Sequence, residues 1–323
     1  MKTRKTVAVA ATLAATVILA GCGSSSTPSS GGGPTTAGAA GATTKLTVGM
    51  GQRVFTAPMT TDAFSAAGLD VTQQTLNSGA AGVPLLLNGQ LQFIEADAVG
   101  VLTAISKNIP LVIVGVVTSS ATTPAADNTG VFVKPDSPIQ SAADLSGKKV
   151  AVNAVGGGAQ LSAAASIDKL GGDSSKVNFV ELPPATIIPS VLNGTVDAGV
   201  TTEPVVGVKA IIRPLATGTP GAPQIVWATT QSYLAQNRGV VEKFSAAAAK
   251  ANTYLSTHPE AIRKIVLNDP TINMTPEQAA SMPLPQFTPV DIQKSALQPL
   301  VDLMVKFKVI KSPVDLNKAV FTP

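Results

Sequence analysis

The stretch PLLLNGQLQ, residues 84–92, decides the fold, because the related stretch PSVLNGTVD follows at residues 189–197, 105 residues later. Two further elements match at the same spacing within one residue: Val71–Leu76 with Val177–Leu182, and Leu46–Gly49 with Val150–Asn153. The Asn-Gly step in each copy is typical of a helix that ends in a left-handed turn before a strand. Three elements in one order at one spacing indicate two copies of a βαβαβ unit.

Short, valine-rich segments recur along the chain and predict strands. They are Leu46–Gly49, Val71–Leu76, Leu91–Ala96, Leu111–Val117, Val131–Val133, Lys149–Asn153, Val177–Leu182, Val196–Thr201 and Ile225–Thr229. Their apolar residues do not alternate cleanly, which is typical of parallel strands covered on both faces. Helical stretches such as Ala159–Leu170 separate them. We therefore expect an α/β fold with two open, mostly parallel sheets flanked by helices, in which ligands bind at the carboxyl ends of the strands.

The order of these elements predicts two lobes that face one cleft. We assign residues 45–127 and 224–323 to lobe I, and residues 128–223 to lobe II. The chain then crosses between the lobes near Asp127–Val131 and again near Ala222–Ile225. These two crossings form the predicted hinge.

The N-terminal segment has the pattern of a secretory signal peptide, which we place at residues 1–21. A charged start, MKTRK, precedes an uncharged run over residues 6–20 that is too short to span a bilayer comfortably. The run ends in Leu-Ala-Gly-Cys22, which resembles the bacterial lipobox, where the cysteine thiol is diacylated and the leader is cut before it. The alternative is an ordinary signal peptide with a chance cysteine.

The segment 22–44 predicts a flexible linker, because it holds no charge and no large apolar side chain that could repay the entropy of ordering. We therefore expect an extracytoplasmic protein that is lipid-anchored to the cell membrane at Cys22.

The composition excludes several classes of protein. Only 13% of the residues are charged, and the chain has one histidine and one cysteine. This excludes histidine-rich metal sites, disulfide frameworks, iron–sulfur clusters and most histidine-dependent catalysis, unless His258 is the base. The net charge of +4 falls to +1 without Lys2, Arg4 and Lys5, which leaves 20 basic and 19 acidic residues. No basic stripe with interleaved aromatics is present, so we expect no nucleic-acid partner.

A series of phrases in the remaining chain carries a family resemblance. In order they are LTVGMGQ (46–52), AAGLDV (66–71), NSG (77–79), LLNGQLQF (86–93), SAADLSGKKVAV (141–152), GGGAQ (156–160), VELPPA (180–185), VLNGTVDAGVTTEP (191–204) and STHPEAIRKIV (256–266). They resemble the type II periplasmic substrate-binding proteins that serve nitrate, sulfonate, taurine and related ABC importers (SsuA/TauA/NMT1-THI5-like). The resemblance covers nearly all of residues 45–323 and implies a two-lobed binding protein that captures a small solute, with no chemical reaction, cofactor or metal.

The loops after the predicted strands supply the candidate ligand-binding residues. They are Gly51, Gln52, Arg53, Phe55, Ser78, Gly79 and Asp97 in lobe I, and Gly157, Gly158, Ala159, Gln160 and Glu203 in lobe II. Gln52 offers hydrogen bonds in both directions, Arg53 can pair with an oxyanion, and Phe55 can stack on a ligand. The alternative for Arg53 is a solvated surface side chain.

Two of these loops open helices, where free backbone N–H groups attract anions. The Gly156–Gln160 loop is either a simple tight turn or an anion site, and the family resemblance favours ligand contact there. Ser78 can cap its helix and also contact the ligand, because both roles turn N–H groups toward the cleft. Proline occupies the matching place in lobe II, so we expect weaker anion capture there.

Three acids, Glu95, Asp97 and Glu203, lie near strand ends. The repeat places Asp97 and Glu203 at matching strand ends, and the Glu203-Pro204 step matches the family. Because we place only Arg53 as a nearby cation, two carboxylates in the cleft disfavour a bare oxyanion and favour a ligand with an amino or N–H donor group. The alternative is that these acids pair with hinge groups and are structural.

The sequence thus predicts the substrate-binding lipoprotein of an ABC importer, acting as a monomer with a permease and its ATPase as partners. Its solute is a small polar organic compound, either sulfonate- or taurine-like or another amino-bearing or anionic molecule. Two alternatives stay open. One is a lipid-anchored sensor or surface interaction protein on the same fold. The other is an enzyme related to pyrimidine-synthesis proteins, which use a cysteine-rich motif and a histidine that this chain lacks.

Overall fold

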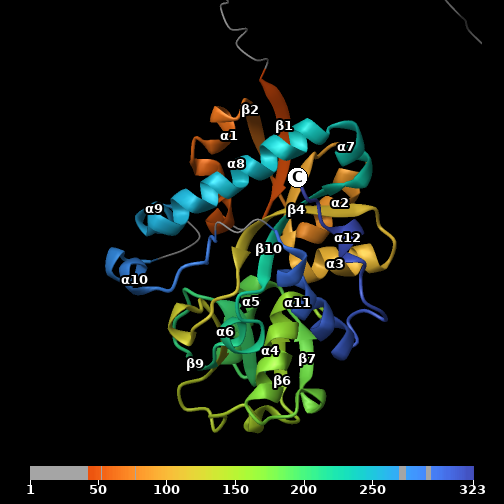
Figure 1. Cartoon of the computed structure of the whole chain (residues 1–323). Helices are drawn as coiled ribbons and strands as arrows, with labels where there is room; N and C mark the ends of the chain where they lie inside the picture. The colour runs from red at the N-terminus through yellow and green to blue at the C-terminus, as the bar shows by residue number, and fades with distance from the viewer. Residues whose placement is uncertain (1–42, 52, 77, 269–273, 289–291) are drawn as a thin grey trace, which may run out of the picture. The chain divides into compact units, whose positions relative to one another are not determined.

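The computed structural model describes residues 43–51, 53–76, 78–268, 274–288 and 292–323. Two five-stranded sheets form the framework, and helices cover them (Figure 1). We call the sheets A and B, and keep the names lobe I and lobe II for the parts built on them. The predicted signal peptide, Cys22 and most of the predicted linker lie outside the described residues. The first strand begins at Thr44, one residue before the predicted start of lobe I.

Sheet A has the strand order β2-β1-β3-β10-β4. Its strands are β1 Thr44–Met50, β2 Leu69–Thr75, β3 Phe93–Asp97, β4 Leu111–Ser119 and β10 Pro223–Thr230. β1 pairs in parallel with β2 and β3, whereas β10 runs antiparallel to both β3 and β4. The returning chain therefore inserts one reversed strand between two strands that are neighbours in sequence.

Sheet B has the corresponding order, β7-β6-β8-β5-β9. Its strands are β5 Thr129–Val133, β6 Lys149–Val152, β7 Asn178–Glu181, β8 Ala198–Thr202 and β9 Lys209–Ile212. Here β5 is the reversed strand, antiparallel to β8 and β9. Four of the five strands in each sheet thus share one direction, which confirms the mostly parallel α/β fold. All nine predicted strands are present with shifted bounds, and β9 was not predicted.

The duplicated stretch forms the same structure twice. Helices α2 Gly79–Leu87 and α5 Pro184–Leu192 have equivalent bounds, and each ends at an Asn C-cap. The glycines that follow, Gly89 and Gly194, both adopt φ of 79°, the left-handed conformation that glycine accepts without a steric penalty. The predicted helix ends are therefore confirmed in both copies.

The other helices cover the faces of the sheets. They are α1 Ala63–Ala66, α3 Ala98–Ser106, α4 Gly158–Lys169, α6 Pro214–Gly218, α7 Gln231–Gln236, α8 Arg238–Thr257, α9 Pro259–Leu267, α10 Pro276–Ser281, α11 Lys294–Lys306 and α12 Leu316–Ala319, with the 3₁₀ segments η1 Arg53–Thr60, η2 Pro124–Ala126, η3 Ala143–Leu145 and η4 Ser174–Lys176. α8 buries Val241, Phe244, Ala248, Ala251 and Leu255, which recur every three or four residues and form one apolar stripe.

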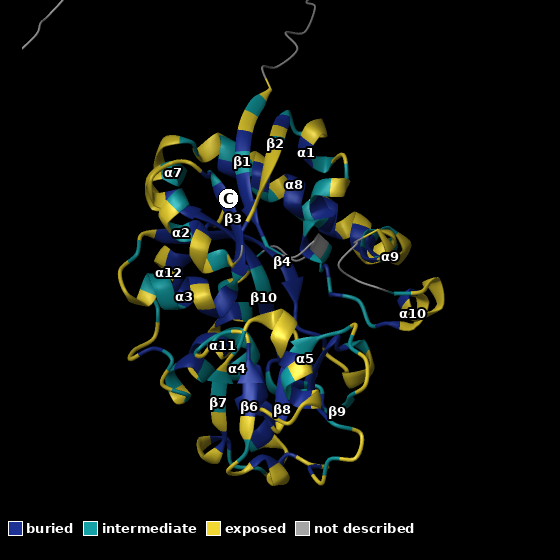
Figure 2. Cartoon of the chain, turned by 180° about the vertical axis from the view of Figure 1, so that it is seen from behind, coloured by how far each residue is buried: buried dark blue, intermediate teal, exposed yellow. Residues whose placement is uncertain are grey.

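Each sheet separates its own apolar cores, and β3, β4 and β5 are among the most deeply buried elements, whereas the edge strands β2 and β7 are largely exposed or half-buried (Figure 2). On one side of sheet A an aromatic cluster forms, in which Phe244 stacks on Phe93 with ring centroids 3.8 Å apart and meets Trp227 edge-on at 5.4 Å. The largest cluster against sheet B is built from Val, Ile, Leu and Ala. All the clusters draw on residues within 46–321, so the compact unit 41–323 contains its own cores.

Among the described residues, no helix has the length and apolarity needed to cross a bilayer. Cys22, the predicted site of the lipid anchor, lies outside those residues.

Candidate functional site

Three helix or loop starts follow the carboxyl ends of sheet A, as the sequence predicts. Gly51 follows β1, and its N–H donates to Glu95 Oε2 over 3.1 Å. Ser78 is the exposed N-cap of α2, and its hydroxyl accepts from the N–H of Ala81. Asp97 ends β3 and caps α3 by accepting from the N–H of Gly100 over 3.0 Å. Of the neighbouring candidates, Gln52 and the side chain of Arg53 lie outside the described residues.

Gly79 brings α2 close to the sheet. A Cβ at this position would lie 2.5 Å from the Cβ of Ala96, so only glycine allows this approach. The start of α2 therefore lies directly beside the end of β3.

Glu95 is a buried acid at the same edge of the sheet. It is only 5% exposed, and burial raises its pKa to about 7, although the N–H of Gly51 acts in the opposite direction. Trp227 lies opposite Glu95 in the antiparallel pairing of β10 with β3. Its indole Nε1 has no hydrogen-bond partner among the described residues. Lobe I thus buries two polar groups just behind the ends of its strands.

In lobe II, the glycine loop after β6 opens helix α4. Gly157 is the N-cap and supplies no side-chain cap, so the first N–H groups of the helix stay free of a local partner. Gln160 turns back, and its Oε1 accepts from the N–H of Gly156 over 2.7 Å. Ala159 packs at the edge of the aliphatic core of lobe II. The geometry is that of a helix N-terminus available to a negative group.

A negative group from lobe I reaches this helix. A Cβ at Gly158 would lie 2.4 Å from Asp97 Oδ2, so the Asp97 carboxylate is in close contact with the first residue of α4. Burial raises the pKa of Asp97, whereas hydrogen bonding from backbone N–H groups lowers it. One carboxylate therefore caps α3 of its own lobe and also contacts the first residue of α4 in the other lobe.

Further contacts hold α4 against lobe I. Leu161 is 2% exposed and belongs to an apolar cluster whose other buried members come from lobe I. Near the other end of the helix, Lys306 Nζ of α11 lies 3.5 Å from Asp168 Oδ2. A groove of about 400 Å³ runs between α4 and residues 306–309. The two lobes are thus in contact along the length of α4, which lies beside α11 in Figure 1.

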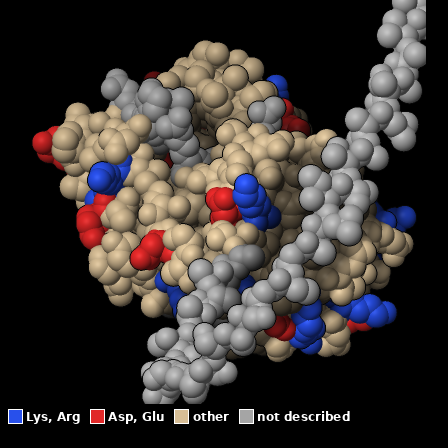
Figure 3. Space-filling view, turned by 90° about the horizontal axis from the view of Figure 1, so that it is seen from above, with Lys and Arg blue, Asp and Glu red and all other residues tan. Residues whose placement is uncertain are grey.

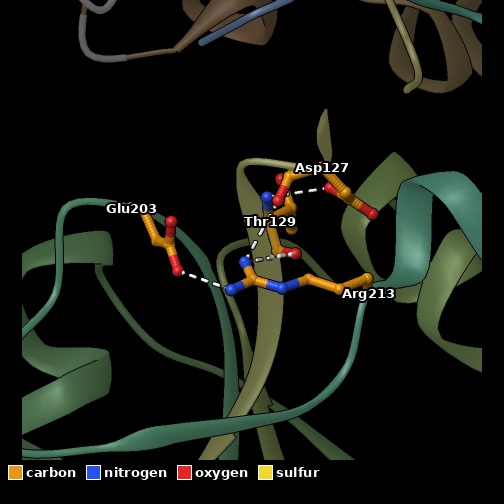
Figure 4. A network of polar contacts seen from close by, with 4 residues as sticks. All are labelled: Asp127, Thr129, Glu203 and Arg213. Atoms are coloured by element: carbon orange, nitrogen blue, oxygen red, sulfur yellow. Dashed lines mark hydrogen bonds and ion pairs between the residues drawn. The ribbon is translucent and has the colours of Figure 1, made fainter. Parts of the chain in front are cut away.

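Glu203 differs from its prediction, because it is neutralised within the protein. Arg213 Nη2 lies 2.8 Å from Glu203 Oε1, and both side chains are largely buried. Arg213 Nη1 also donates to the carbonyl of Asp127 over 3.1 Å, in the first hinge crossing (Figure 4). The expectation that Arg53 is the only nearby cation was therefore wrong. Arg213 directly follows β9, the strand that the sequence did not reveal.

Asp127 completes this hinge network. Its carboxylate accepts from the N–H of Thr129 over 2.9 Å and from the N–H of Ala216 over 2.8 Å, at the start of α6. Burial raises the pKa of Asp127, and the same backbone N–H groups lower it. The network ties the crossing to two segments of lobe II, which supports the structural alternative for Glu203.

Two aromatic residues lie in the core. Phe55, predicted to stack on a ligand, is only 7% exposed and packs in the aromatic cluster of lobe I. Its ring is placed there because η1 turns the chain back onto the sheet directly after β1. Trp227, on β10, is fully buried in the same cluster.

The described residues contain no group of three or more histidine, cysteine, aspartate or glutamate side chains that could hold a metal ion. His258 stacks on Tyr254 with centroids 4.0 Å apart, and its Nδ1 lies 2.8 Å from the Tyr254 carbonyl. On the face shown in Figure 3, acidic and basic side chains are interspersed rather than gathered by sign.

The model of the NMT1/THI5 like family matches residues 61–262, which is more than half of the chain. The chain belongs to this family. The match spans the first copy of the repeated unit from β2 onward and all of the second copy, and it confirms the family resemblance seen in the sequence. No curated protein matches the chain in sequence.

Solved structures share the fold at low identity. The periplasmic aliphatic sulphonate binding protein SsuA of Escherichia coli is 17% identical, with 86% of this chain and 92% of that chain covered and a TM-score of 0.68. The alkanesulfonate-binding protein SsuA of Xanthomonas axonopodis pv. citri, bound to MOPS, is also 17% identical, with 87% and 99% covered and a TM-score of 0.68. The desulfurization enzyme DSZB is 16% identical, with 86% and 96% covered and a TM-score of 0.57. The NMT1/THI5 like chain thus has a fold on which both binding proteins and an enzyme occur.

Proposed function

We propose that this protein is the solute-binding component of an ABC importer. The contact between Asp97 and Gly158 carries the proposal, because it brings the loops at the carboxyl ends of both sheets to one interlobe site. Open α/β sheets bind ligands at this edge. The sulfonate-binding proteins that share the fold support a small polar organic solute of sulfonate type.

The proposed mechanism is closure of the lobes around the solute. A solute that contacts both lobes stabilises the closed form and shifts the population toward it, and a permease then recognises that form. A solute that contacted only one lobe would not change the population of the closed form. The hinge network of Arg213, Glu203 and Asp127 fits this mechanism, because it fixes the crossing to lobe II and leaves closure to the segments on either side.

Binding rather than catalysis is proposed, since the described residues of the site supply helix N-termini and capping side chains, and no pair of nucleophile and base is found among them. We further propose that the mature protein is extracytoplasmic and held to the membrane through a lipid on Cys22. Its partners are then a permease with its ATPase.

Thermal-shift measurements on residues 41–323 test solute binding, with sulfonates, amines, pyrimidines and aromatic acids as probes. A bound probe at 100 times its Kd stabilises the protein by about 2.7 kcal/mol. Gly158→Leu fills the interlobe site and should abolish the shift. Gly239→Leu is the matched control, because a Cβ there meets nothing within 4 Å. If no probe shifts the melting temperature, or if Gly158→Leu leaves the shift unchanged, the proposed site is wrong.

The anchor has a separate test. Cys22→Ser should abolish incorporation of a radioactive fatty acid and release the mature protein from membranes on fractionation. A variant that still takes up label and pellets with membranes would overturn the lipobox interpretation.

A further inference from the structure

A groove on the surface of lobe I is separate from the proposed solute site. Its volume is about 470 Å³, and its lining residues lie within residues 60–67 and 250–254. The first segment runs from the end of η1 through α1, and the second is part of α8. These elements pack against each other (Figure 1), and Phe64 of α1 meets Phe244 of α8 with ring centroids 5.2 Å apart. Both walls of the groove therefore belong to lobe I.

Tyr254 forms an aromatic wall of this groove. Its side chain is exposed, and His258 stacks against one face of its ring with the two planes at 11°. The imidazole is itself held, because His258 Nδ1 lies 2.8 Å from the Tyr254 carbonyl oxygen. His258 follows Tyr254 by one turn of helix, whereas the groove residues Lys250 and Ala251 precede it by one turn. The other face of the braced ring is therefore on the side of the groove.

Two groups of opposite charge line the same groove. Asp62 and Lys250 are both exposed, and among the described side chains neither has an ion-pair partner. The hydroxyl of Thr60 donates to the carbonyl of Ala57 over 2.8 Å, so its oxygen can still accept a hydrogen bond. Four further lining residues are alanines, whose small side chains leave the space open. The groove thus combines an aromatic face with donors and acceptors whose charges cancel.

We propose that this groove binds the ring of a neutral sugar. The C–H faces of a sugar ring pack on an aromatic ring, and its hydroxyl groups donate to a carboxylate and accept from an ammonium. A charged ligand would meet one like charge, in Asp62 or in Lys250, whereas hydroxyl groups can use both. Small-molecule sites have volumes of about 300–1,000 Å³, so the groove suits a single ring rather than a long chain. The sugar is a second ligand, bound by lobe I alone.

Saturation-transfer NMR on residues 41–323 tests this site, with methyl β-glucopyranoside as the probe. The wild-type protein should transfer saturation to the ring C–H protons of the probe. Tyr254→Ala removes the stacking face and should abolish the transfer, whereas Tyr254→Phe keeps the ring and should retain it. Leu87→Ala, at an exposed side chain of α2, is the matched control and should behave like the wild type. Circular dichroism checks that each variant is folded.

The polar groups are tested by the Kd values of the same probe and of two related sugars. Lys250→Met should weaken binding of the methyl glucoside by about tenfold, because a donor to its hydroxyl groups is lost. Lys243→Met, at an exposed lysine of the same helix, should have no effect. Glucuronate, which adds a carboxylate to the ring, should bind more weakly than the methyl glucoside. Cellotriose, a chain of three rings, should bind with a similar Kd.

The interlobe site is distinguished by Gly158→Leu, which fills it and should leave sugar binding unchanged. Loss of sugar binding in Gly158→Leu would place the probe between the lobes and overturn the sugar groove while the proposed function stands. No transfer with the wild type, or equal transfer with Tyr254→Ala, also overturns it. Tighter binding of glucuronate would contradict the neutral ligand, and much tighter binding of cellotriose would contradict the single ring.

Discussion

Lobe I and lobe II place different side chains at equivalent points of equivalent sheets. Near the carboxyl end of β3, the middle strand of sheet A, Glu95 lies opposite Trp227, whereas the matching pair in sheet B is Val200 opposite Val131. Lobe II therefore fills this position with two aliphatic groups that need no partner. Lobe I buries a carboxyl group whose pKa is raised to about 7 and an indole N–H that has no partner among the described residues.

The contrast shows that the backbone shared by the two sheets does not require polar side chains at these two positions. Burying polar groups without full hydrogen bonding costs free energy, and the fold accepts valine at the same points. The lobes also pack differently. Lobe I relies on stacked aromatic rings, while lobe II brings helices α4 and α6 together at Gly218, where a Cβ would lie 2.2 Å from the Ser162 carbonyl oxygen.

The largest expected effect is loss of the aromatic cluster. Phe244→Ala should lower the free energy of unfolding by about 3–5 kcal/mol, because it removes the ring that contacts Phe93, Trp227 and Phe64. In lobe II, Ile167→Val removes one methylene from an aliphatic core and should cost about 0.5–1.5 kcal/mol. Urea denaturation measures both, and equal losses would contradict the proposed difference in packing.

The buried acid should make stability depend on pH. Because the pKa of Glu95 is raised from 4.5 to about 7, the folded state holds a proton between these values that the unfolded state has lost. The free energy of unfolding should therefore fall as pH rises through this window. Glu95→Gln should remove this fall, leaving the variant more stable than the wild type by about 3 kcal/mol at pH 8 and nearly equal at pH 4.

Denaturation curves at pH 4 and pH 8 provide the measurement for this variant. Glu242→Gln, at an exposed ion pair with Arg238, is the control and should behave like the wild type at both values. A stability difference between Glu95→Gln and the wild type that is the same at pH 4 and pH 8 would show that Glu95 is not protonated by burial.

The next largest effect on stability is expected at the close contact between α4 and α6 in lobe II. Gly218→Ala should destabilise the protein by about 1–3 kcal/mol, because the new methyl group meets backbone of α4 that cannot move without separating the helices. Gly239→Ala, where a Cβ has open space, should not destabilise. Thermal denaturation compares the two, and an unaffected Gly218→Ala variant would mean that α4 and α6 are free to move apart.

The smallest expected effect concerns the hinge. Glu203→Gln should lower the free energy of unfolding by about 1 kcal/mol, since it leaves Arg213 without its ionic partner in a partly solvated site. Solute affinity should change little, because Glu203 is already neutralised. A large gain in affinity for an anionic probe would instead show that Glu203 lies at the ligand site.

The fold could be predicted from the sequence because the repeat is encoded locally. The helix bounds of α2 and α5 follow from the Asn-Gly steps and the proline- and glycine-rich starts, and α4 lies within a residue of its prediction. β9 has only four residues, Lys209–Ile212, too few to show a pattern. Without β9, nothing placed Arg213 near Glu203, ten residues away in sequence.

The candidate site was predicted only as a set of loops. Strand ends place Asp97 and Gly158 at the edges of their sheets, but which groups meet depends on how α4 packs against lobe I. That packing involves Leu161 and Lys306, which carry no local signal for an interlobe contact. The burial of Phe55 likewise depends on tertiary packing, because an aromatic residue in a loop has the same sequence pattern at a ligand and in a core.

The position of β10 has a consequence for the order in which the chain can fold. All five strands of sheet B lie within residues 129–212, so this lobe is complete as a continuous piece. Sheet A needs β10, at residues 223–230, between β3 and β4, and its outer strand β4 also receives Phe321, whose N–H donates to Ile113. During synthesis, the strands of lobe II are therefore complete while sheet A of lobe I still lacks β10 between β3 and β4. Lobe I can reach its native topology only after β10 and Phe321 have been made, so we expect it to fold later than lobe II.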